Sequence, residues 1–435
     1  MAFCGLDFGT SNTALGTFEG GVPVLMPLEA GQPTIPSAIF FPRDSGAALI
    51  GRQAIDAYVD GTPGRFMRSL KSVLGTALID ETTSLYRKRV KFRDVIASYL
   101  DAVKVRAEQA AGDAFENAVL GRPVHFVDNS PEGDRKAEDT LREIAHGIGF
   151  KDVTFQFEPI AAALEYERQV TREEIALIAD IGGGTSDFSI VRLSPERHRK
   201  VDRKDDILAN DGVRIGGTDF DRRLNLGSLM PLLGYNSAMK RAGMHTPTHY
   251  FYDLATWSSI NRMYEPKVLT EIRQVRREAS QPELLDRLLT VLEEQRGHTL
   301  AMDVETAKIA LSEAEKFDFS LSWIEPGLTA AISRADFVAH TMKLAARIGA
   351  RIKTCLDQAK LAAGDIDAVF LTGGSVRMPH VRGAILAGVP AAQVVEGDAF
   401  GAVGKGLTVE AERRFGGKMS GRTTGSRRPA SNAGR

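Results

Sequence analysis

Cysteine is almost absent from this sequence. The 435 residues contain only two cysteines, Cys4 and Cys355, which lie far apart. Cys4 falls in an apolar, strand-like segment and Cys355 in a helical pattern, so we expect both to be buried hydrophobic side chains rather than a disulfide or a metal pair. Nothing in the cysteine content indicates an oxidising compartment.

Long apolar runs and an excess of one charge are lacking too. No run reaches the roughly 18 apolar residues that a membrane-spanning helix needs. The first residues, MAFCGLDFGTSN, have neither the basic lead nor the apolar segment of a signal peptide. The formal net charge of −1 provides no general attraction to nucleic acid or to a membrane surface. We therefore expect a cytoplasmic protein with no nucleic-acid and no membrane partner.

The composition that remains is typical of a folded protein with more than one domain. Hydrophobic residues make up 43% and charged residues 26% of the chain, and 435 residues are too many for one ordinary core. The last residues, GGKMSGRTTGSRRPASNAGR, have no apolar periodicity and are rich in Gly, Ser and Arg. This pattern predicts a disordered basic tail over residues 416–435.

Two glycine-containing motifs carry most of the functional information. GLDFGTSNT at residues 5–13 and ADIGGGTSD at residues 179–187 both read apolar, Asp, apolar, Gly, Thr, Ser. Each motif is flanked by apolar, β-rich residues, which indicates a hairpin. The same pattern in both halves of the chain predicts two related domains that face each other.

These motifs have the chemistry of a phosphate site. Glycine lets backbone N–H groups approach a phosphate with no Cβ in the way, and the Thr and Ser hydroxyls add further donors. The carboxylates would repel a phosphate, so their natural role is to hold a hydrated Mg²⁺. The alternative is that Gly and Asp serve only as turn formers. A third glycine turn, in VFLTGGSVRMPHV, follows an apolar strand and precedes a helix, which favours the phosphate-site interpretation.

Helical patterns flank these turns. In RVKFRDVIASYLDAVKVRAEQAAG the apolar residues follow helical spacing, and Gly112 is the expected stop. In VTFQFEPIAAALEYE a strand ends at Glu158, and Pro159 occupies the expected first helical position, where its missing N–H costs nothing. Glu158 is thus expected at a strand–helix junction. No Walker P-loop is present, because Ala399 stands where the motif before Gly404-Lys405 requires Gly.

Together the motifs resemble the ATPase domain of the 70-kDa heat-shock (DnaK-like) chaperones, within the actin/sugar-kinase/heat-shock superfamily. The resemblance rests on GLDFGTSN, SLKSVLG, FEPIAAALEY, DIGGGTSDFSI, GVRIGGTDFDRRL, FLTGGSVRMPHV and GDAFGAVGKG. The combination of LGRPVHF, FQFEPIAAALEYE and LMPLLG is most similar to the YegD-like members. The resemblance implies an α/β, two-lobed actin-like fold made of duplicated ribonuclease-H-like domains with a nucleotide cleft between the lobes. The expected limits are 1–172 for lobe I, 173–394 for lobe II with an atypical peripheral subdomain at 234–300, and 395–415 for a helix returning to lobe I.

The resemblance also implies roles for individual residues. Asp7, Asp180 and Asp187 resemble the acids that hold Mg²⁺ through water. Lys71 resembles the lysine that reaches the γ-phosphate and the attacking water, and Glu158 the acid that helps to order that water. With Asp180 and Thr185 these two form the expected catalytic set. The expected phosphate cradles are Gly9, Thr10, Ser11, Asn12, Gly182, Gly183, Gly184 and Thr185.

Further positions resemble contacts to the rest of the nucleotide. Gly216 and Gly217 lie in a second-lobe glycine turn. The expected ribose, adenine and adenosine contacts are Glu305, Lys308, Ser312, Gly373, Gly374, Ser375 and Arg377, and Asp398 resembles the acid that closes the site. The implied ligands are ATP or ADP with Mg²⁺, and the implied partner is a protein or client.

Three departures from the family pattern bear on function. Ile309 stands where the family commonly has an arginine that stacks on adenine, residues 234–300 are unlike the usual second-lobe region, and no apolar linker or peptide-binding β-sandwich follows residue 415. We therefore expect a slowly hydrolysing ATPase whose lobe closure is read by a partner. The alternative is a nucleotide-binding regulatory or scaffold protein with little or no hydrolysis. A small-molecule kinase or a filament former is a third alternative, although no sugar-pocket carboxylate base stands out.

Overall fold

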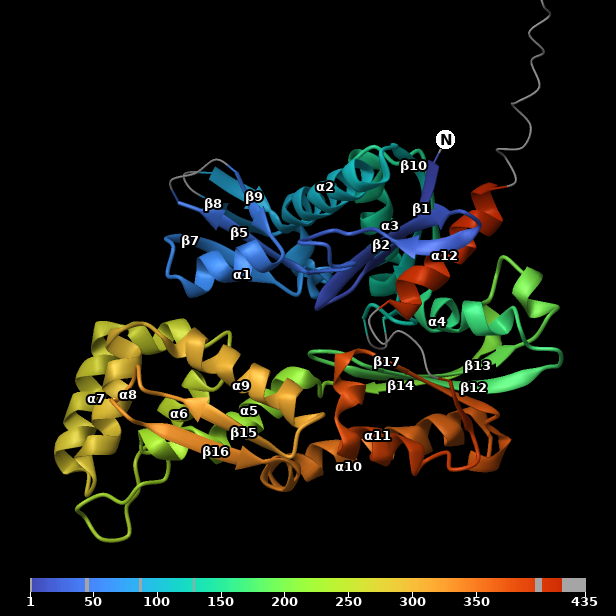
Figure 1. Cartoon of the computed structure of the whole chain (residues 1–435). Coiled ribbons are helices and arrows are strands. Elements are labelled where there is room, and N and C mark those ends of the chain that lie inside the picture. Colours follow the sequence, from blue (N-terminus) through green and yellow to red (C-terminus); the bar gives the residue numbers. More distant parts are fainter. Residues whose placement is uncertain (1, 44–46, 86–87, 128–129, 396–400, 417–435) are drawn as a thin grey trace, which may run out of the picture.

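The computed structural model describes residues 2–43, 47–85, 88–127, 130–395 and 401–416. Asp398 and the predicted tail beyond Gly416 lie outside these residues. The described chain forms two lobes, drawn one above the other in Figure 1.

The first lobe is built around a six-stranded sheet. Its strands are β1 (Ala2–Phe8), β2 (Asn12–Glu19), β3 (Val22–Leu25), β4 (Thr34–Pro36), β10 (Phe115–Arg122) and β11 (Asp152–Phe157). Its two long helices are α2 (Phe92–Ala111) and α3 (Pro131–Gly147). Gly112 ends α2 in the left-handed conformation with φ 68°, as the sequence predicted.

A smaller arm extends from this lobe. It contains β5 (Ala38–Pro42), β6 (Leu49–Ile50), α1 (Arg52–Val59), β7 (Gly64–Arg68), β8 (Thr82–Leu85) and β9 (Lys88–Lys91), with 3₁₀ turns η1 (Leu70–Val73) and η2 (Ala77–Asp80). The strands β6, β5 and β7 form a separate sheet. The arm is the part of the first lobe that lies over the helices of the second lobe in Figure 1.

The second lobe carries a five-stranded sheet. Its strands are β12 (Glu174–Ile181), β13 (Ser186–Leu193), β14 (Ile207–Val213), β17 (Ala368–Thr372) and β18 (Gln393–Val395), and its helices include α5 (Gly217–Ser228), α10 (Arg334–Ala359) and α11 (Pro379–Leu386). The 3₁₀ turns are η3 (Arg197–Arg199), η4 (Lys204–Asp206), η5 (Met230–Leu233), η6 (Ile260–Tyr264), η7 (Ala363–Asp365) and η8 (Gly374–Arg377).

The two sheets have the same topology. The order β3-β2-β1-β10-β11 in the first lobe matches β14-β13-β12-β17-β18 in the second. In each, an antiparallel three-stranded meander is followed by two strands that run parallel to its first strand. This duplication confirms the two related halves that the repeated glycine motifs predicted.

The segment 234–300 is more regular than the sequence suggested. It forms α6 (His249–Leu254), α7 (Pro266–Glu278), α8 (Pro282–Glu293) and the start of α9 (Gly297–Leu311), followed by the hairpin β15 (Lys316–Ser320) and β16 (Thr329–Ser333). Apolar residues of these helices, including Leu254, Ile272 and Leu288, belong to the same core as the second-lobe sheet. The segment is therefore an integral part of the second lobe.

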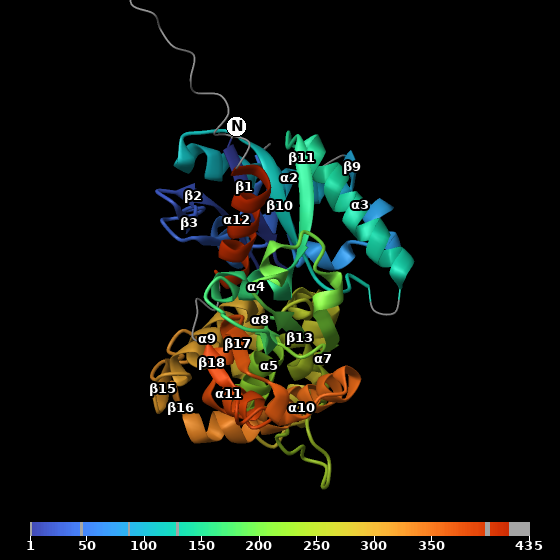
Figure 2. The ribbon, with the colours of Figure 1, turned by 90° about the vertical axis from the view of Figure 1, so that its right-hand side faces the viewer.

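Two helices connect the lobes on one side. In the end view of Figure 2, α4 (Glu158–Glu167) lies between the upper and lower halves, and α12 (Ala402–Phe415) lies above it in the upper half. Ala161 of α4 packs in a cluster with Leu407 of α12 and with first-lobe residues, whereas Ile160 of α4 packs against the second-lobe sheet. The helix α4 thus contacts both sheets.

Both cysteines are fully buried, as expected, and are free thiols. No helix among the described residues has the length and apolar character that crossing a membrane would require.

Candidate functional site

The two predicted hairpin turns meet at the junction of the lobes. One turn joins β1 to β2 and contains Ser11; the other joins β12 to β13 and contains Gly183. A Cβ built on Gly183 would lie only 2.5 Å from the Ser11 Oγ atom. The Ser11 side chain would have to move to admit any side chain at Gly183, so the opposing turns are in direct contact across the lobes.

The glycine turns of the second lobe are hydrogen-bonded to one another. The N–H of Gly217 donates to the Gly182 carbonyl at 3.0 Å, and the N–H of Thr218 donates to the Gly183 carbonyl at 2.8 Å. The Ser375 hydroxyl also donates to the Gly182 carbonyl, at 3.1 Å. Residues from three distant parts of the sequence therefore form one backbone-lined surface.

Two further glycines are needed for this close approach. A Cβ on Gly216 would lie 2.4 Å from the backbone nitrogen of Gly184. Gly373 has φ 80°, and a Cβ there would lie 2.3 Å from the Ile181 carbonyl oxygen. Any side chain at these positions would separate the turns.

Carboxylates gather beside these turns. Asp180 and Asp187 are direct partners in the β12–β13 ladder. Burial, and then the charges of Asp187 and Glu158, raise the pKa of Asp180 to about 7. Burial and Glu158, opposed by Lys71, raise the pKa of Asp7 to about 7. The acidic side chains of the site thus carry more negative charge than its basic side chains neutralise.

Lys71 and Glu158 form an ion pair within this cluster. Lys71 is only 8% exposed. Burial alone would lower the pKa of Lys71, but Glu158, Asp7 and Asp180 together raise it above its ordinary value. Glu158 is the first residue of α4, so Pro159 is at the second helical position rather than the predicted first; its missing N–H still costs nothing in the first turn.

The predicted adenosine contacts lie on the second-lobe side. Glu305 and Lys308 are on α9 and Ser312 follows its last residue. The Lys308 ammonium pairs with Asp221 of α5 at 2.9 Å, and lies 3.3 Å from the position of a Cβ on Gly217. Lys308 is therefore at the edge of the glycine surface.

Asp221 was missed by the sequence analysis. Burial, opposed by Lys308 and reinforced by Glu305, raises the pKa of Asp221 to about 6. The available signal was a second acid two positions after the helix-capping Asp219 in GGTDFDRRL. Of the remaining predicted contacts, Arg377 is exposed at the end of η8, and Ile309 is 60% exposed on α9.

The donor set fits a magnesium–nucleotide ligand. Carboxylate oxygens are the ligands that Mg²⁺ prefers, and the glycine turns provide backbone N–H groups for phosphates. Among the described residues, no three His, Cys, Asp or Glu side chains are placed to share a metal ion directly.

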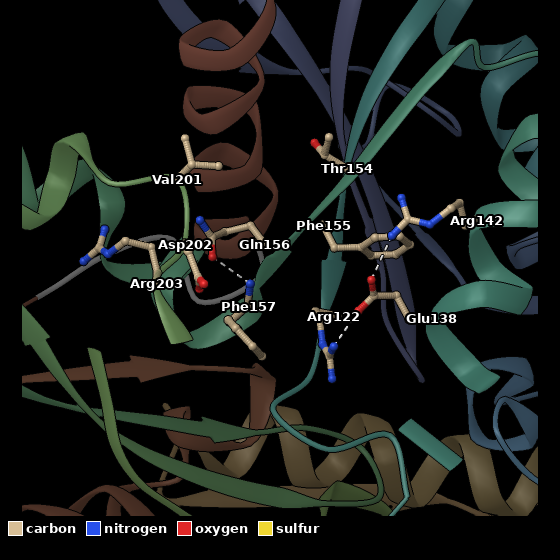
Figure 3. Close-up of a pocket in the computed structure, with 10 residues that line it drawn as sticks. All are labelled: Arg122, Glu138, Arg142, Thr154, Phe155, Gln156, Phe157, Val201, Asp202 and Arg203. Atoms are coloured by element: carbon tan, nitrogen blue, oxygen red, sulfur yellow. Dashed lines mark hydrogen bonds and ion pairs between the residues drawn. The ribbon is translucent and has the colours of Figure 1, made fainter. Parts of the chain in front are cut away.

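A cavity lies at the lobe junction, beside Phe157, and is shown in Figure 3. Its volume is about 240 Å³, and first-lobe residues such as Arg122 and Gln156 line it together with residues 201–203 of the second lobe. Glu138 accepts hydrogen bonds from Arg122 at 2.5 Å and from Arg142 at 2.8 Å. Because both lobes contribute to the wall, the shape of this cavity depends on their relative tilt.

The duplicated sheets and the glycine-lined junction define the class of two-lobed, actin-like ATPases. A family model described as Hsp70 protein matches residues 82–226 and 289–415. These segments cover more than half of the chain, which therefore belongs to the Hsp70 family of nucleotide-binding, chaperone-type ATPases. Residues 1–81, with Asp7 and Lys71, and residues 227–288 lie outside the matched segments.

Proposed function

We propose that this chain is a slow, Mg²⁺-dependent ATPase that binds ATP or ADP between its lobes, and that a partner protein reads the resulting closure. The observation that carries the proposal is the contact between Gly183 and Ser11 beside the buried Lys71–Glu158 pair. Phosphate-binding turns from opposite lobes would both contact the same polyphosphate, so ligand binding would be coupled to lobe position.

The acidic residues account for the need for a cation. Asp7, Asp180 and Asp187 would hold hydrated Mg²⁺, which when bound neutralises charge on the phosphates. Lys71 presents its ammonium at the same place, where it would stabilise charge that develops during attack by water. Glu158 holds Lys71 in position and would orient that water.

The same ion pair accounts for slow turnover. Glu158 already accepts a hydrogen bond from the Lys71 ammonium, so this carboxylate oxygen is engaged and not free to take a proton from water. Asp7 and Asp180 would be occupied with the cation. The described residues of the cluster thus include no strong general base.

Lys308 and Ser375 support the placement of the nucleoside. Both lie against the glycine surface, within the second lobe, next to where a Cβ on Gly217 would be. Ile309 would provide only an aliphatic contact to a base, so we expect weaker selectivity for adenine than an arginine would give.

The cavity beside Phe157 supports a partner that reads lobe tilt. Phe157 lines this cavity and Glu158 is the next residue in the chain, so a change at the ion pair would be transmitted directly to the cavity wall. A partner that contacts both walls would distinguish the open from the closed arrangement.

The second candidate function is nucleotide binding with little or no hydrolysis. The exposed Ile309 and the engagement of Glu158 by Lys71 favour it. A phosphate-release assay on the purified protein separates the two functions. Membership of the YegD-like group, a cytoplasmic location and the lobe limits 1–172, 173–394 and 395–415 stay predictions.

Calorimetric titration of ATP with and without Mg²⁺, followed by analysis of the products, tests the proposal. We expect binding that strengthens when Mg²⁺ is present, and slow formation of ADP and phosphate. Binding without product formation would establish the second candidate. Absence of binding in both titrations would overturn both.

A further inference from the structure

The lobes meet a second time, at the end of the molecule away from α4 and α12. In Figure 1 the helix α1 of the first-lobe arm lies over the peripheral helices of the second lobe, opposite the connecting helices. The contact joins Tyr58, at the end of α1, to second-lobe residues around η6 and α9. This second contact is independent of the glycine turns.

Four of the residues at this contact form what we call the aromatic clasp: Tyr58, Trp257, Asn261 and His298. The Asn261 side-chain amide donates to the Tyr58 hydroxyl at 2.6 Å. The Tyr58 ring lies edge-on to the His298 ring, with centroids 4.5 Å apart, and 6.3 Å from the Trp257 ring. Such ring pairs contribute beyond the area they bury.

The first-lobe half of the clasp is held in place by its own lobe. Tyr58 stacks on Phe66 of β7 with the ring centroids 4.5 Å apart and an angle of 10° between the planes. Tyr58 and Phe66 also pack on the small core of the arm around Phe40 and Ala54. The tyrosine is therefore oriented before the lobes meet.

The second-lobe half is equally ordered. The Trp257 and His298 rings are in edge-on contact, with centroids 4.8 Å apart. His298 is only 3% exposed. The Tyr264 hydroxyl accepts a hydrogen bond from the N–H of Gly297 at 3.0 Å, which fixes the start of α9 against η6. Little conformational entropy is lost when two ordered halves meet, which favours a contact that opens and closes as a unit.

Rigid elements link the clasp to the candidate nucleotide site on both lobes. On the first lobe, β7 runs from Phe66 to Arg68 and leads into η1 with Lys71. The Arg68 guanidinium lies 5.3 Å from the Trp257 ring centroid. On the second lobe, α9 carries His298 at its start and Glu305 and Lys308 further along. Separating the lobes at the clasp would therefore widen the approach to the site.

Three of the four clasp residues lie outside the segments that the Hsp70 family model matches. Tyr58 falls within residues 1–81, and Trp257 and Asn261 fall within residues 227–288. The clasp thus gives a role to parts of the chain that the family model does not cover.

We propose that the aromatic clasp holds the lobes together at the mouth of the junction and that its opening limits the release of bound nucleotide. This inference rests on the proposed function for its ligand, a nucleoside di- or triphosphate. The contact itself does not depend on that function, so two separate measurements are needed.

The first measurement uses fluorescence without nucleotide. The sequence has two tryptophans, so Trp323→Phe leaves Trp257 as the only one. In this background we expect Tyr58→Ala to increase the quenching of Trp257 by acrylamide, because a ring that packs beside Trp257 is removed. Unchanged quenching would overturn the clasp, whatever the protein binds.

The second measurement is the dissociation rate of N-methylanthraniloyl-ADP by stopped flow. Tyr58→Phe and Asn261→Ala each remove one hydrogen bond, and we expect release to become roughly fivefold faster. Tyr58→Ala also removes the ring contacts, and we expect release to be at least about thirtyfold faster. Asn261 is exposed, so its variant tests the clasp even if Tyr58→Ala does not fold.

Tyr252→Ala is the matched control. Tyr252 is an exposed tyrosine of the same peripheral segment, but its ring contacts Tyr235 within the second lobe. We expect its release rate to equal that of the wild type. Equal release rates for wild type, Asn261→Ala and Tyr58→Phe would overturn the gating role. Failure of the wild type to bind the ADP analogue would instead overturn the proposed function. In that case the quenching measurement alone would test whether the clasp exists.

Discussion

Lys71 and Glu158 form an ion pair although 87 positions separate them in the chain. Lys71 reaches the pair from η1 and Glu158 from the first residue of α4. Because α4 packs against both sheets, the pair connects the candidate catalytic lysine to the element between the lobes. A change in the charge of the phosphates of a bound nucleotide would act first on these two side chains.

Replacing Lys71 tests its chemical role. We expect Lys71→Ala to lower the rate of ATP hydrolysis at least about 100-fold, because a positioned charge acting on the transition state is lost. Binding of ATP should be largely retained, because the glycine turns are unchanged. Single-turnover phosphate release and calorimetry measure the two effects.

The control for this variant is Lys267→Ala, which removes an exposed lysine on α7. We expect wild-type rates for it. Equal turnover of wild type and Lys71→Ala would remove Lys71 from the catalytic set.

Replacing Asp180 tests whether the acidic cluster is arranged for a cation. Asp180 faces Asp187 across the ladder and is also repelled by Glu158. Asp180→Asn keeps the shape and removes one charge, so we expect the nucleotide-free protein to gain stability, on the order of 1 kcal/mol. We also expect the enhancement of ATP binding by Mg²⁺ to decrease.

Thermal unfolding without nucleotide and calorimetry with and without Mg²⁺ check these two opposite effects. A loss of stability together with an unchanged Mg²⁺ effect would show that Asp180 is a structural carboxylate.

The sequence predicted the features of this fold that local patterns encode. Two repeated Asp–Gly–Thr–Ser hairpins predicted the duplicated sheets, and the Phe-Glu-Pro junction placed Glu158 between a strand and a helix. Each of these predictions depends on a few neighbouring residues that sterically restrict the local backbone conformation.

Contacts between distant residues could not be predicted in the same way. The pair Lys308–Asp221 spans 87 positions, and Tyr58–Asn261 spans 203. No local pattern identifies the two residues of such a pair as partners, since an acid on a helix or a tyrosine at a helix end is ordinarily exposed to solvent. Only the packing of the lobes brings them together.

The contact between Gly183 and Ser11 can be tested by steric substitution. We expect Gly183→Ala to weaken ATP binding at least about tenfold, because its Cβ would lie 2.5 Å from Ser11 Oγ and keep the turns apart. Gly364→Ala is the matched control, because Gly364 lies outside the site in η7 of the second lobe and a Cβ there meets no atom within 4 Å. Adding Ser11→Gly to Gly183→Ala should restore part of the affinity, and a purely additive double variant would argue against direct contact of the turns.

His298 gives the protein a defined dependence of stability on pH. Burial lowers the pKa of His298 to about 4, and a hydrogen bond with the Trp257 backbone offsets this only in part. The unfolded chain protonates near the ordinary value of 6.5, so between pH 6.5 and 4 it binds more protons than the folded protein. The free energy of unfolding should therefore fall as the pH is lowered through this window, by up to about 3 kcal/mol, and change little below it.

The variant His298→Gln removes this titration and keeps a polar side chain at the clasp. We expect its free energy of unfolding, measured by urea titration at a series of pH values, to fall less steeply between pH 6.5 and 4 than that of the wild type. His380, another second-lobe histidine whose pKa burial lowers to about 4, contributes equally to both proteins and cancels in the comparison. Identical slopes would mean that His298 takes up its proton at the same pH whether the chain is folded or not.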